Sequence, residues 1–373
     1  MLEPVIIGSA MSTTGPFAEL KLPHLLGAEM AVSDVNREGG IFFLGERHPV
    51  VLINHDSASG LRRCVDNVRK LVYEDRVDFM INVDVTSDQA LAAQQITEAA
   101  AVPILHIGLS RKLIGPQAYY TFRDVLSVRE RVPILYAYLR QNNPQCRRIA
   151  VINMDTELGR EHLEAVTATA PRYGFKVTRA RLYDPLNTDY DALLADALKD
   201  NPDIFDHGAG AANPVDTIFP ALSRRGYRGL LVSSNDYPTA PAISGRLGPG
   251  GDSILEGYLQ FGSDDAADDY PEDLKRLKQR ALDTAGIYSS GTATLYEKVG
   301  WIKQGVEGCG TTDADVFVKW LETNPVETAY GPARFGGKSV YGINRQLEGY
   351  FGLLRFTGGR QRQVHRGKFS FNG

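Results

Sequence analysis

The chain has 373 residues, of which 43% are apolar and 23% charged, a balance typical of globular proteins. One hydrophobic core rarely extends over so many residues, so we expect two domains. The formal net charge of −4 comes without a block of lysine or arginine, which excludes the electrostatic signature of a nucleic-acid-binding protein. No apolar run reaches the roughly 18 residues that a membrane helix needs.

The leading strand is predicted at residues 5–10, and a loop at 11–18 follows it. The next helix ends at the pair Gly39–Gly40, which suits a left-handed C-terminal cap. Its buried face shows the 3-4-3 spacing of an amphipathic helix at Leu25, Ala28, Val32 and Val35.

Short apolar strands and amphipathic helices go on alternating over the first 250 residues. Further strands are expected at residues 50–54, 77–83, 102–108, 148–154, 177–183, 204–208 and 230–234. Such alternation indicates parallel sheets covered by helices on both faces. The alternation restarts near residues 120–132, so we predict an α/β fold with two doubly wound parallel-sheet lobes.

Cysteine spacing gives no sign of a disulfide framework or a zinc site. Cys64, Cys146 and Cys309 are far apart and form no CxxC pair. Cys64 falls at a helical core spacing within 61–72 and is interpreted as a small buried hydrophobe. We therefore predict neither a metal nor a cofactor.

The third quarter of the chain is predicted to be helical at 271–285, 292–307 and 313–323, and the last 40 residues are expected to form short strands. An acidic loop precedes these helices, with Asp264, Asp265, Asp268 and Asp269. Calcium is one reading of these carboxylates, but the EF-hand spacing is absent, which favours a solvated surface loop.

Two segments resemble nucleotide-binding motifs but lack residues that those motifs require. Residues 208–213 follow a strand like a dinucleotide-binding glycine loop but lack its third glycine, so a nucleotide-linked enzyme stays only as an alternative. Residues 332–339 resemble a Walker A loop that begins with proline, and we interpret them as a turn between strands. His106 and His207 end predicted strands and are interpreted as structural. We predict that the protein is not an enzyme.

The carboxyl ends of the predicted strands carry the more informative pattern. Ligands of open parallel sheets bind there, where helix N-termini present unpaired N–H groups. Small polar residues fill these loops at 12–17, 84–87, 108–110, 154–156, 208–210 and 235–237. They predict recognition of a small polar or zwitterionic molecule in a cleft between two lobes.

Several segments resemble leucine/isoleucine/valine-type solute-binding proteins of ABC importers. The N-terminal signature comprises Gly15-Pro16-Phe17, residues 27–32 and residues 36–40. Further agreement lies at 68–80, 101–104, 148–153, 226–227, 235–236 and 255–258, so that the resemblance covers roughly residues 4–355.

This resemblance implies the type I periplasmic-binding fold, in which three crossovers join the lobes and hinge closure buries the ligand. We expect one lobe at residues 1–122 and 258–331, and the other at 123–257 and 332–373. Hinges are expected near 121–127, 257–262 and 331–335.

The same resemblance implies that the closed, loaded protein docks on an ABC permease, acts as a monomer and binds no nucleic acid. We expect a periplasmic protein whose export signal has been removed, because residues 1–4 show no leader. A cytoplasmic sensor of amides or aromatic acids with the same fold is the alternative.

In amino-acid-binding members of this family, the first lobe holds the ligand's α-carboxylate and the second lobe meets its α-ammonium. The match assigns the carboxylate to Gly108 and Ser110 and the ammonium to Asp236. The other ligand-binding residues are expected at Phe17, Leu20, Asp84, Val85, Thr86, Asp155, Leu158, Gly208 and Gly210.

Two departures from the family pattern bear on the ligand. Asp84 stands where a small neutral residue is usual, and it would repel a carboxylate unless it points away or a cation such as Arg111 or Lys112 intervenes. Leu158 and Gly210 stand where amino-acid binders often place tyrosines. A short-chain amide, an aromatic acid and an amine therefore stay open as ligands.

Overall fold

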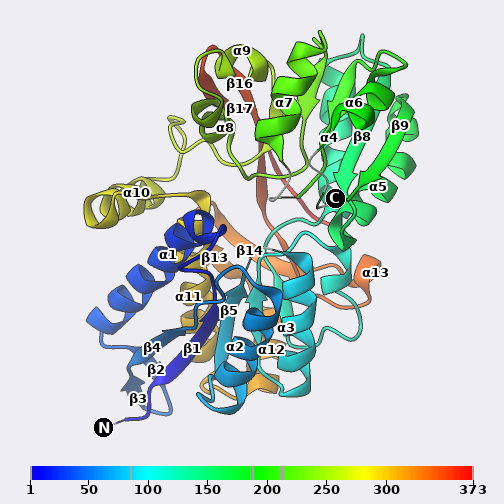
Figure 1. Cartoon of the computed structure of the whole chain (residues 1–373). Coiled ribbons are helices and arrows are strands. Elements are labelled where there is room, and N and C mark those ends of the chain that lie inside the picture. The colour runs from blue at the N-terminus through cyan, green and yellow to red at the C-terminus, as the bar shows by residue number, and fades with distance from the viewer. Residues whose placement is uncertain (1, 85, 185, 187–188, 211–213, 372–373) are drawn as a thin grey trace.

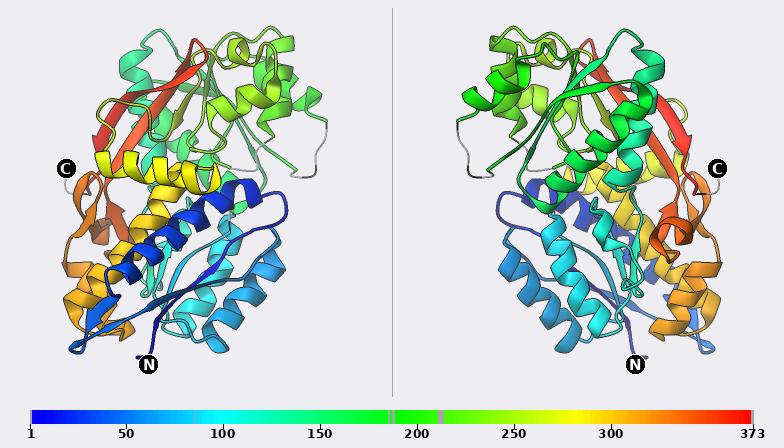
Figure 2. Two further views of the ribbon diagram at one scale, coloured as in Figure 1. Left: turned by 90° about the vertical axis from the view of Figure 1, so that its left-hand side faces the viewer. Right: turned by 90° about the vertical axis from the view of Figure 1, so that its right-hand side faces the viewer.

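A computed structural model describes residues 2–84, 86–184, 186, 189–210 and 214–371. The chain forms two lobes, one above the other in Figure 1, and each lobe is a sheet with helices on both faces. Figure 2 shows the same two lobes from the sides, with the N-terminus at the end of the first lobe that lies away from the second. None of the described helices combines the length and apolar character that a membrane span requires. The predicted α/β class with two doubly wound lobes is confirmed.

The first lobe is built on an eight-stranded sheet. Its core is parallel, and antiparallel pairing occurs only at the β13–β14–β15 edge. In spatial order the strands are β13 (Val326–Thr328), β14 (Gly331–Gly336), β15 (Gln346–Glu348), β7 (Thr121–Arg123), β6 (Ile104–His106), β5 (Phe79–Val83), β1 (Val5–Ala10) and β4 (Val50–Asn54).

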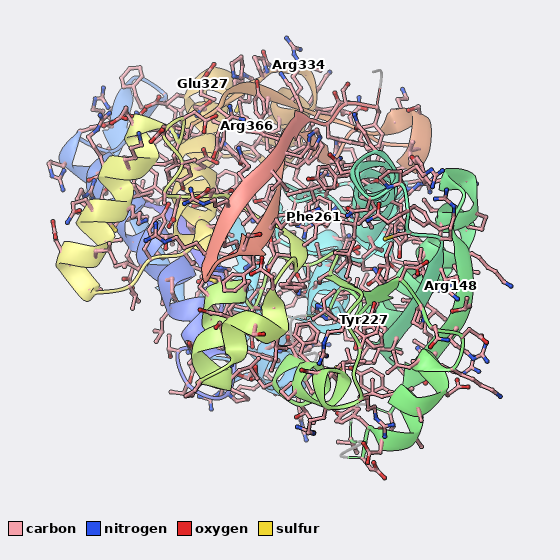
Figure 3. All side chains as sticks on the ribbon, turned by 90° about the horizontal axis from the view of Figure 1, so that it is seen from above. Arg148, Tyr227, Phe261, Glu327, Arg334 and Arg366 are labelled. Carbon is pink, nitrogen blue, oxygen red and sulfur yellow. The ribbon has the colours of Figure 1, made fainter. Side chains whose placement is uncertain are left out.

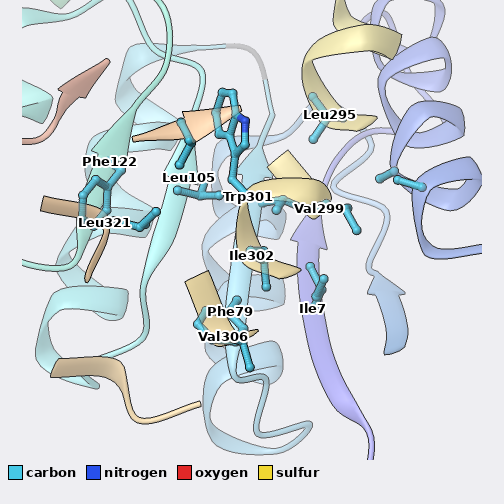
Figure 4. Packing of buried hydrophobic residues seen from close by; sticks show 14 of the residues in the cluster. Ile7, Phe79, Leu105, Phe122, Leu295, Val299, Trp301, Ile302, Val306 and Leu321 are labelled. Carbon is cyan, nitrogen blue, oxygen red and sulfur yellow. The ribbon is translucent and has the colours of Figure 1, made fainter. Parts of the chain in front are cut away.

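Five helices sandwich this sheet. One face packs against α1 (Ala18–Arg37), α11 (Ser290–Cys309) and α12 (Ala314–Thr323), and the other against α2 (Leu61–Tyr73) and α3 (Ser87–Ala99). Figure 4 shows the first of these cores, where Val299 and Ile302 of α11 lie over Ile7 and Phe79 of the strands. Cys64 is fully buried in the second core, as predicted.

The second lobe holds a seven-stranded sheet that ends in a long antiparallel hairpin. In spatial order its strands are β17 (Arg360–Lys368), β16 (Tyr350–Thr357), β12 (Leu259–Phe261), β11 (Leu230–Val232), β10 (Ile204–Asp206), β8 (Arg148–Met154) and β9 (Lys176–Tyr183). The helices on one face are α4 (Val128–Asn142) and α5 (Glu157–Thr169), and those on the other are α6 (Asp191–Leu198), α7 (Val215–Arg224), α8 (Ala240–Leu247) and α9 (Gly251–Leu255).

The remaining elements are short or peripheral. A two-stranded hairpin, β2 (Ile41–Phe43) and β3 (Glu46–His48), projects beyond the first sheet. Helix α10 (Glu272–Ala285) packs beside α1 and α11. The one-turn segments are η1 (Arg111–Leu113), η2 (Ala170–Tyr173) and α13 (Lys338–Tyr341).

The chain passes between the sheets three times. It leaves the first sheet after β7 and enters α4, and it returns after β12 through an irregular segment to α10. The third passage is a single residue, Gly349, between β15 and β16. The first two passages fall at or beside the hinges predicted near 121–127 and 257–262.

Three expectations about the C-terminal third are wrong. Residues 332–348 were assigned to the second lobe, but β14 and β15 pair within the first sheet, so the predicted crossover at 331–335 lies at Gly349 instead. Residues 259–261 belong to the second sheet rather than the first. The predicted turn at 332–339 is mostly strand β14 followed by the one-turn helix α13. The glycine-rich composition of these short strands gives no periodicity that would assign them to a sheet.

A fully buried arginine, Arg123 at the end of β7, ties the first and third passages together. Its guanidinium donates to the carbonyl of Ser110 at 2.6 Å, to Oε1 of Gln346 at 2.5 Å and to the hydroxyl of Tyr341 at 3.0 Å. The Gln346 amide in turn donates to the carbonyl of Val125 at 3.2 Å, inside the first passage. Buried polar groups that are satisfied in this way stiffen the structure around them.

Helices α1 and α11 cross at unusually close range because glycine stands at the crossing. A Cβ built on Gly27 would lie 2.1 Å from the carbonyl oxygen of Thr292. The close crossing places the N-terminal half of α1 beside the start of α11.

We expect Gly27→Ala to lower the free energy of unfolding by about 1–3 kcal/mol, because the methyl group would overlap backbone that can move only if the helices separate. The matched control is Gly300→Ala in α11, where nothing lies within 4 Å of the added Cβ. That variant should be neutral or slightly stabilised, since alanine is the better helix former. Urea denaturation of both variants would measure the difference, and equal effects would contradict the close crossing.

Candidate functional site

A cavity of about 770 Å³ lies between the two lobes and is lined by residues from both. The first lobe contributes residues of α1, Ser87, 107–109 and the start of α11. The second lobe contributes Leu158, Ala209, residues 235–241 and the turn of the β16–β17 hairpin. Four residues predicted for ligand binding line it, namely Leu20, Gly108, Leu158 and Asp236.

The wall from the first lobe is formed mainly by the N-terminal half of α1. Leu20, Lys21 and His24 line the cavity there. Burial and the nearby lysines keep the pKa of His24 well below its usual value, so this imidazole is neutral. Burial also lowers the pKa of Lys21 to about 8, and the negative charge of Asp84 opposes that change.

Asp84 is buried and does not line the cavity among the described residues. Its Oδ2 accepts hydrogen bonds from the hydroxyls of Ser12 at 2.6 Å and Ser57 at 2.8 Å, and from the Gln89 amide at 3.3 Å. The carboxylate therefore points into the loops of the first lobe and holds them together. The expected ligand contact of Asp84 is replaced by this structural role.

The predicted ligand-binding residues Thr86 and Phe17 also make hydrogen bonds within the first lobe and do not line the cavity. Thr86 caps α3, with its hydroxyl accepting from the Gln89 backbone N–H, so the next residue, Ser87, faces the cavity instead. Val85 lies outside the described residues. Phe17 is the residue before α1, where its N–H donates to the Ser59 hydroxyl at 2.9 Å, and it does not line the cavity.

Ser110 forms part of a polar clasp between the lobes rather than part of the cavity wall. We use the name interlobe clasp for residues 110–112 with Glu157, Glu161 and Glu164 of α5. The Ser110 hydroxyl donates to Glu161 at 2.7 Å, and the Arg111 backbone N–H donates to the same carboxylate at 2.7 Å. Ion pairs join Arg111 to Glu164 at 2.8 Å and Lys112 to Glu157 at 2.6 Å. Arg111 and Lys112 thus face α5 and leave Asp84 without the expected compensation.

On the second lobe, Asp236 lines the cavity with its charge already paired. Arg131 of α4 approaches the Asp236 carboxylate at 3.4 Å and donates to the carbonyls of Leu126 at 2.9 Å and Ser234 at 3.1 Å. The guanidinium also lies 5.0 Å from the ring centre of Phe261, which is labelled beside the β16–β17 hairpin in Figure 3. An α-ammonium at Asp236 would therefore share this carboxylate with Arg131.

The other residues predicted in the second lobe lie outside the cavity wall. Asp155 pairs with Arg160 at 2.7 Å on the surface. The Gly208 N–H donates to Asp206 at 2.9 Å, so this amide is not free to hold a phosphate. Gly210 does not line the cavity, whereas Ala209 does. Residues 211–213 of the same glycine loop lie outside the described residues.

The predicted structural histidines and the acidic loop both have partners within the protein. Burial lowers the pKa of His106 and of His207 to about 3, so both rings are neutral. His106 contacts the carbonyl of Ile107 at 3.1 Å, and His207 contacts the Tyr258 hydroxyl at 2.9 Å. In the acidic loop, Asp265 pairs with Lys278 and Asp269 with Arg366, at 3.0 and 2.7 Å.

Aromatic and apolar groups form much of the remaining wall. Tyr237 follows Asp236, and Tyr270 and Tyr288 join their hydroxyls at 2.8 Å near the start of α11. Ile107, Leu109 and Leu354 add aliphatic surface. A mostly apolar wall with a few charged groups is typical of a site for a small organic molecule.

A smaller cavity of about 200 Å³ adjoins the first and shares Val125, Arg131 and Asp236 with it. Glu297 lines this second cavity and accepts from the Ala329 N–H at 2.7 Å. Burial raises the pKa of Glu297 to about 7, so this group adds less negative charge to the cleft than an exposed glutamate would.

Lys21, His24, Arg131 and the tyrosines were not predicted from the sequence. One signal for Lys21 was present, because it lies four residues before Leu25 and extends the buried 3-4-3 face of α1 toward the strand ends. Arg131 carries no such signal, since its contacts with Ser234 and Asp236 come from a loop more than 100 residues away. Only the folded chain brings these groups to one cleft.

Comparison with known proteins agrees with this architecture. The family model described as periplasmic binding protein matches residues 4–355. An "Amino acid binding protein" of Pseudomonas aeruginosa is 20% identical over 342 residues, which cover 90% of this chain and 87% of that protein.

Two solved structures show the same fold. The leucine binding protein LivK of Thermotoga maritima superposes with a TM-score of 0.81 at 17% identity, over 99% of each chain. A solute binding protein of an R. palustris ABC transporter, in complex with 4-hydroxybenzoate, has a TM-score of 0.81 at 16% identity, over 98% of each chain. Because the family model covers nearly the whole chain, including both lobes and the cleft, this protein belongs to the periplasmic binding protein family.

Proposed function

We propose that this protein is the extracytoplasmic solute-binding protein of an ABC importer and captures a small organic solute, an amino acid or a related compound, by hinge closure. The observation that carries the proposal is the 770 Å³ cavity between the carboxyl-end loops of two parallel sheets. Parallel sheets bind ligands at that edge, and two facing edges can enclose one. Family membership and an amino-acid-binding relative support the same reading.

The proposal extends to the partner and the compartment. The loaded protein acts as a monomer in the periplasm and delivers its solute to an ABC permease. The ABC-transporter context of the R. palustris neighbour and the family description support this part. The cleft recognises its solute without making or breaking a bond.

A sensor of amides or aromatic acids with the same fold is the second candidate. The observation that favours it is the wall of Tyr237, Tyr270 and Tyr288, which suits a flat ring, together with the structural neighbour bound to 4-hydroxybenzoate. Both candidates use the same cleft, so the preferred compound and the cellular location distinguish them.

A thermal-shift screen of amino acids, short amides, polyamines and aromatic carboxylates tests the binding role. A ligand present at a hundred times its dissociation constant should add about 2.7 kcal/mol to the free energy of unfolding, because it binds only the folded state. Mass spectrometry of the released ligand should show the same compound unchanged. No stabilisation by any class, in protein that is folded and free of carried-over ligand, would contradict the proposal.

The interlobe clasp should govern closure. Glu161→Ala removes a buried carboxylate that accepts from Ser110 and Arg111 across the lobes, so we expect roughly tenfold weaker binding and a larger radius of gyration without ligand. Glu164→Ala is the matched control, because its ion pair with Arg111 is mostly exposed and worth about 0–1 kcal/mol. Calorimetry and small-angle X-ray scattering measure both, and equal behaviour of the two variants would show that Glu161 does not hold the lobes together.

A further inference from the structure

A buried lysine that has no hydrogen-bond or ion-pair partner among the described residues faces the cleft. The side chain of Lys21 lines the cavity, and the residue is 2% exposed. Among the described residues, no hydrogen bond or ion pair satisfies its ammonium group, although Asp84 acts on it from a greater distance. A charge that is taken out of water without a partner is costly, so such a group calls for an anion.

The acidic groups around Lys21 make their hydrogen bonds and ion pairs with other residues. Asp84 accepts from two serines and Gln89. Asp124 pairs with Lys298 of α11 at 3.3 Å, and that lysine also donates to the carbonyl of Leu105 at 2.9 Å. The first lobe therefore presents one buried ammonium group to the cavity that no described carboxylate contacts directly, although the charge of Asp84 acts on it from a distance.

The second lobe does not offer a matching free anion. Asp236 pairs with Arg131, which is itself buried and lines the same cavity. The remaining acidic residues of the wall, Glu19, Asp264 and Asp265, are partly or fully exposed at its rim, and Asp265 pairs with Lys278. The enclosed part of the cleft therefore holds the Lys21 ammonium group beside the Arg131–Asp236 ion pair, with Asp84 buried behind the wall.

We propose that Lys21 is the anion-recognition residue of the cleft and that its ligand is a small organic carboxylate, held between the Lys21 ammonium and the amino end of α3 at Ser87. The inference rests on the proposed solute-binding function and specifies its substrate class. The apolar part of the ligand lies against Leu20, Ile107 and Leu158, with Tyr237 at its side. An amino group on the ligand is tolerated by Asp236 but is not required, because Arg131 already neutralises that carboxylate.

The first test compares matched carboxylates and amides by isothermal titration calorimetry on the full chain. The probes are 4-hydroxybenzoate with 4-hydroxybenzamide, and leucine with leucinamide. We expect at least one carboxylate to bind about 10- to 100-fold more tightly than its amide, the range for a charge-assisted contact. Equal or tighter binding of both amides would overturn the inference.

The second test removes the charge. Lys21→Met keeps the length and apolar character of the side chain, and we expect it to weaken carboxylate binding about 10- to 100-fold with little effect on any amide that binds. Lys319→Met is the matched control, because Lys319 is exposed on α12 and does not line the cavity. Unchanged carboxylate affinity in Lys21→Met would overturn the inference.

The pH dependence of the unmodified protein gives a readout that needs no variant. Because the pKa of Lys21 is about 8, carboxylate affinity should be highest below pH 8 and fall about tenfold per pH unit above it, as the ammonium loses its proton. The other groups that act on Lys21 are Asp84, Cys64, Asp124 and Lys298, and burial raises the pKa of Cys64 to about 11. His24 on the same helix is neutral throughout this range. Carboxylate affinity that does not fall at any alkaline pH at which the protein stays folded would overturn the inference.

The two proposals fail in different ways. A neutral or cationic compound that stabilises the protein while every carboxylate fails would overturn the carboxylate inference and leave the solute-binding function intact. Failure of all classes in the thermal-shift screen would overturn both.

Discussion

One wall of the cleft depends on how the buried Arg123 is satisfied. Its guanidinium donates to the loop after β6 and to α13 and β15, which lie more than 200 residues further along the chain. A buried arginine left without these acceptors would cost several kcal/mol, so the segments are held where it needs them. The loop that it fixes, residues 108–112, contributes Gly108 to the cavity wall. The same loop carries the residues of the interlobe clasp that contact α5. One interaction thereby sets both a wall of the cleft and the contact that holds the lobes together.

The electrostatics of the cleft follow from which charges are paired inside each lobe. Lys298 has Asp124, Arg131 has Asp236, and Asp84 has a shell of hydroxyls and an amide. Lys21 alone among these buried groups faces the cavity without such a partner among the described residues. The charge pattern therefore separates groups that hold the protein together from one that is available to a ligand.

The sequence was sufficient to predict the architecture, because alternating apolar strands and amphipathic helices leave few alternatives to two covered parallel sheets. It also predicted four of the loops that line the cavity, those with Ser87, Gly108, Ala209 and Asp236, whereas the loops at 12–17 and 154–156 contribute no lining residue. Side-chain direction was beyond its reach. Asp84 and Ser110 lie in the right loops but turn toward Ser12 and Glu161, partners that are 72 and 51 residues away. The strands β14 and β15 were assigned to the wrong lobe for a related reason, since three to six residues rich in glycine carry too little periodicity to reveal their sheet.

The single residue between β15 and β16 has a mechanical consequence. Consecutive Cα atoms are about 3.8 Å apart, so the single residue Gly349 keeps the end of β15 close to the start of β16. The two sheets therefore cannot move far apart at this point. The passage from β12 to α10 spans residues 262–271, and this longer segment restricts the distance between the two sheets much less. Any relative motion of the lobes must then be a rotation that pivots near Gly349, with its largest displacement at the side farthest from that pivot. Opening of the lobes would therefore widen the cleft most on the side opposite Gly349.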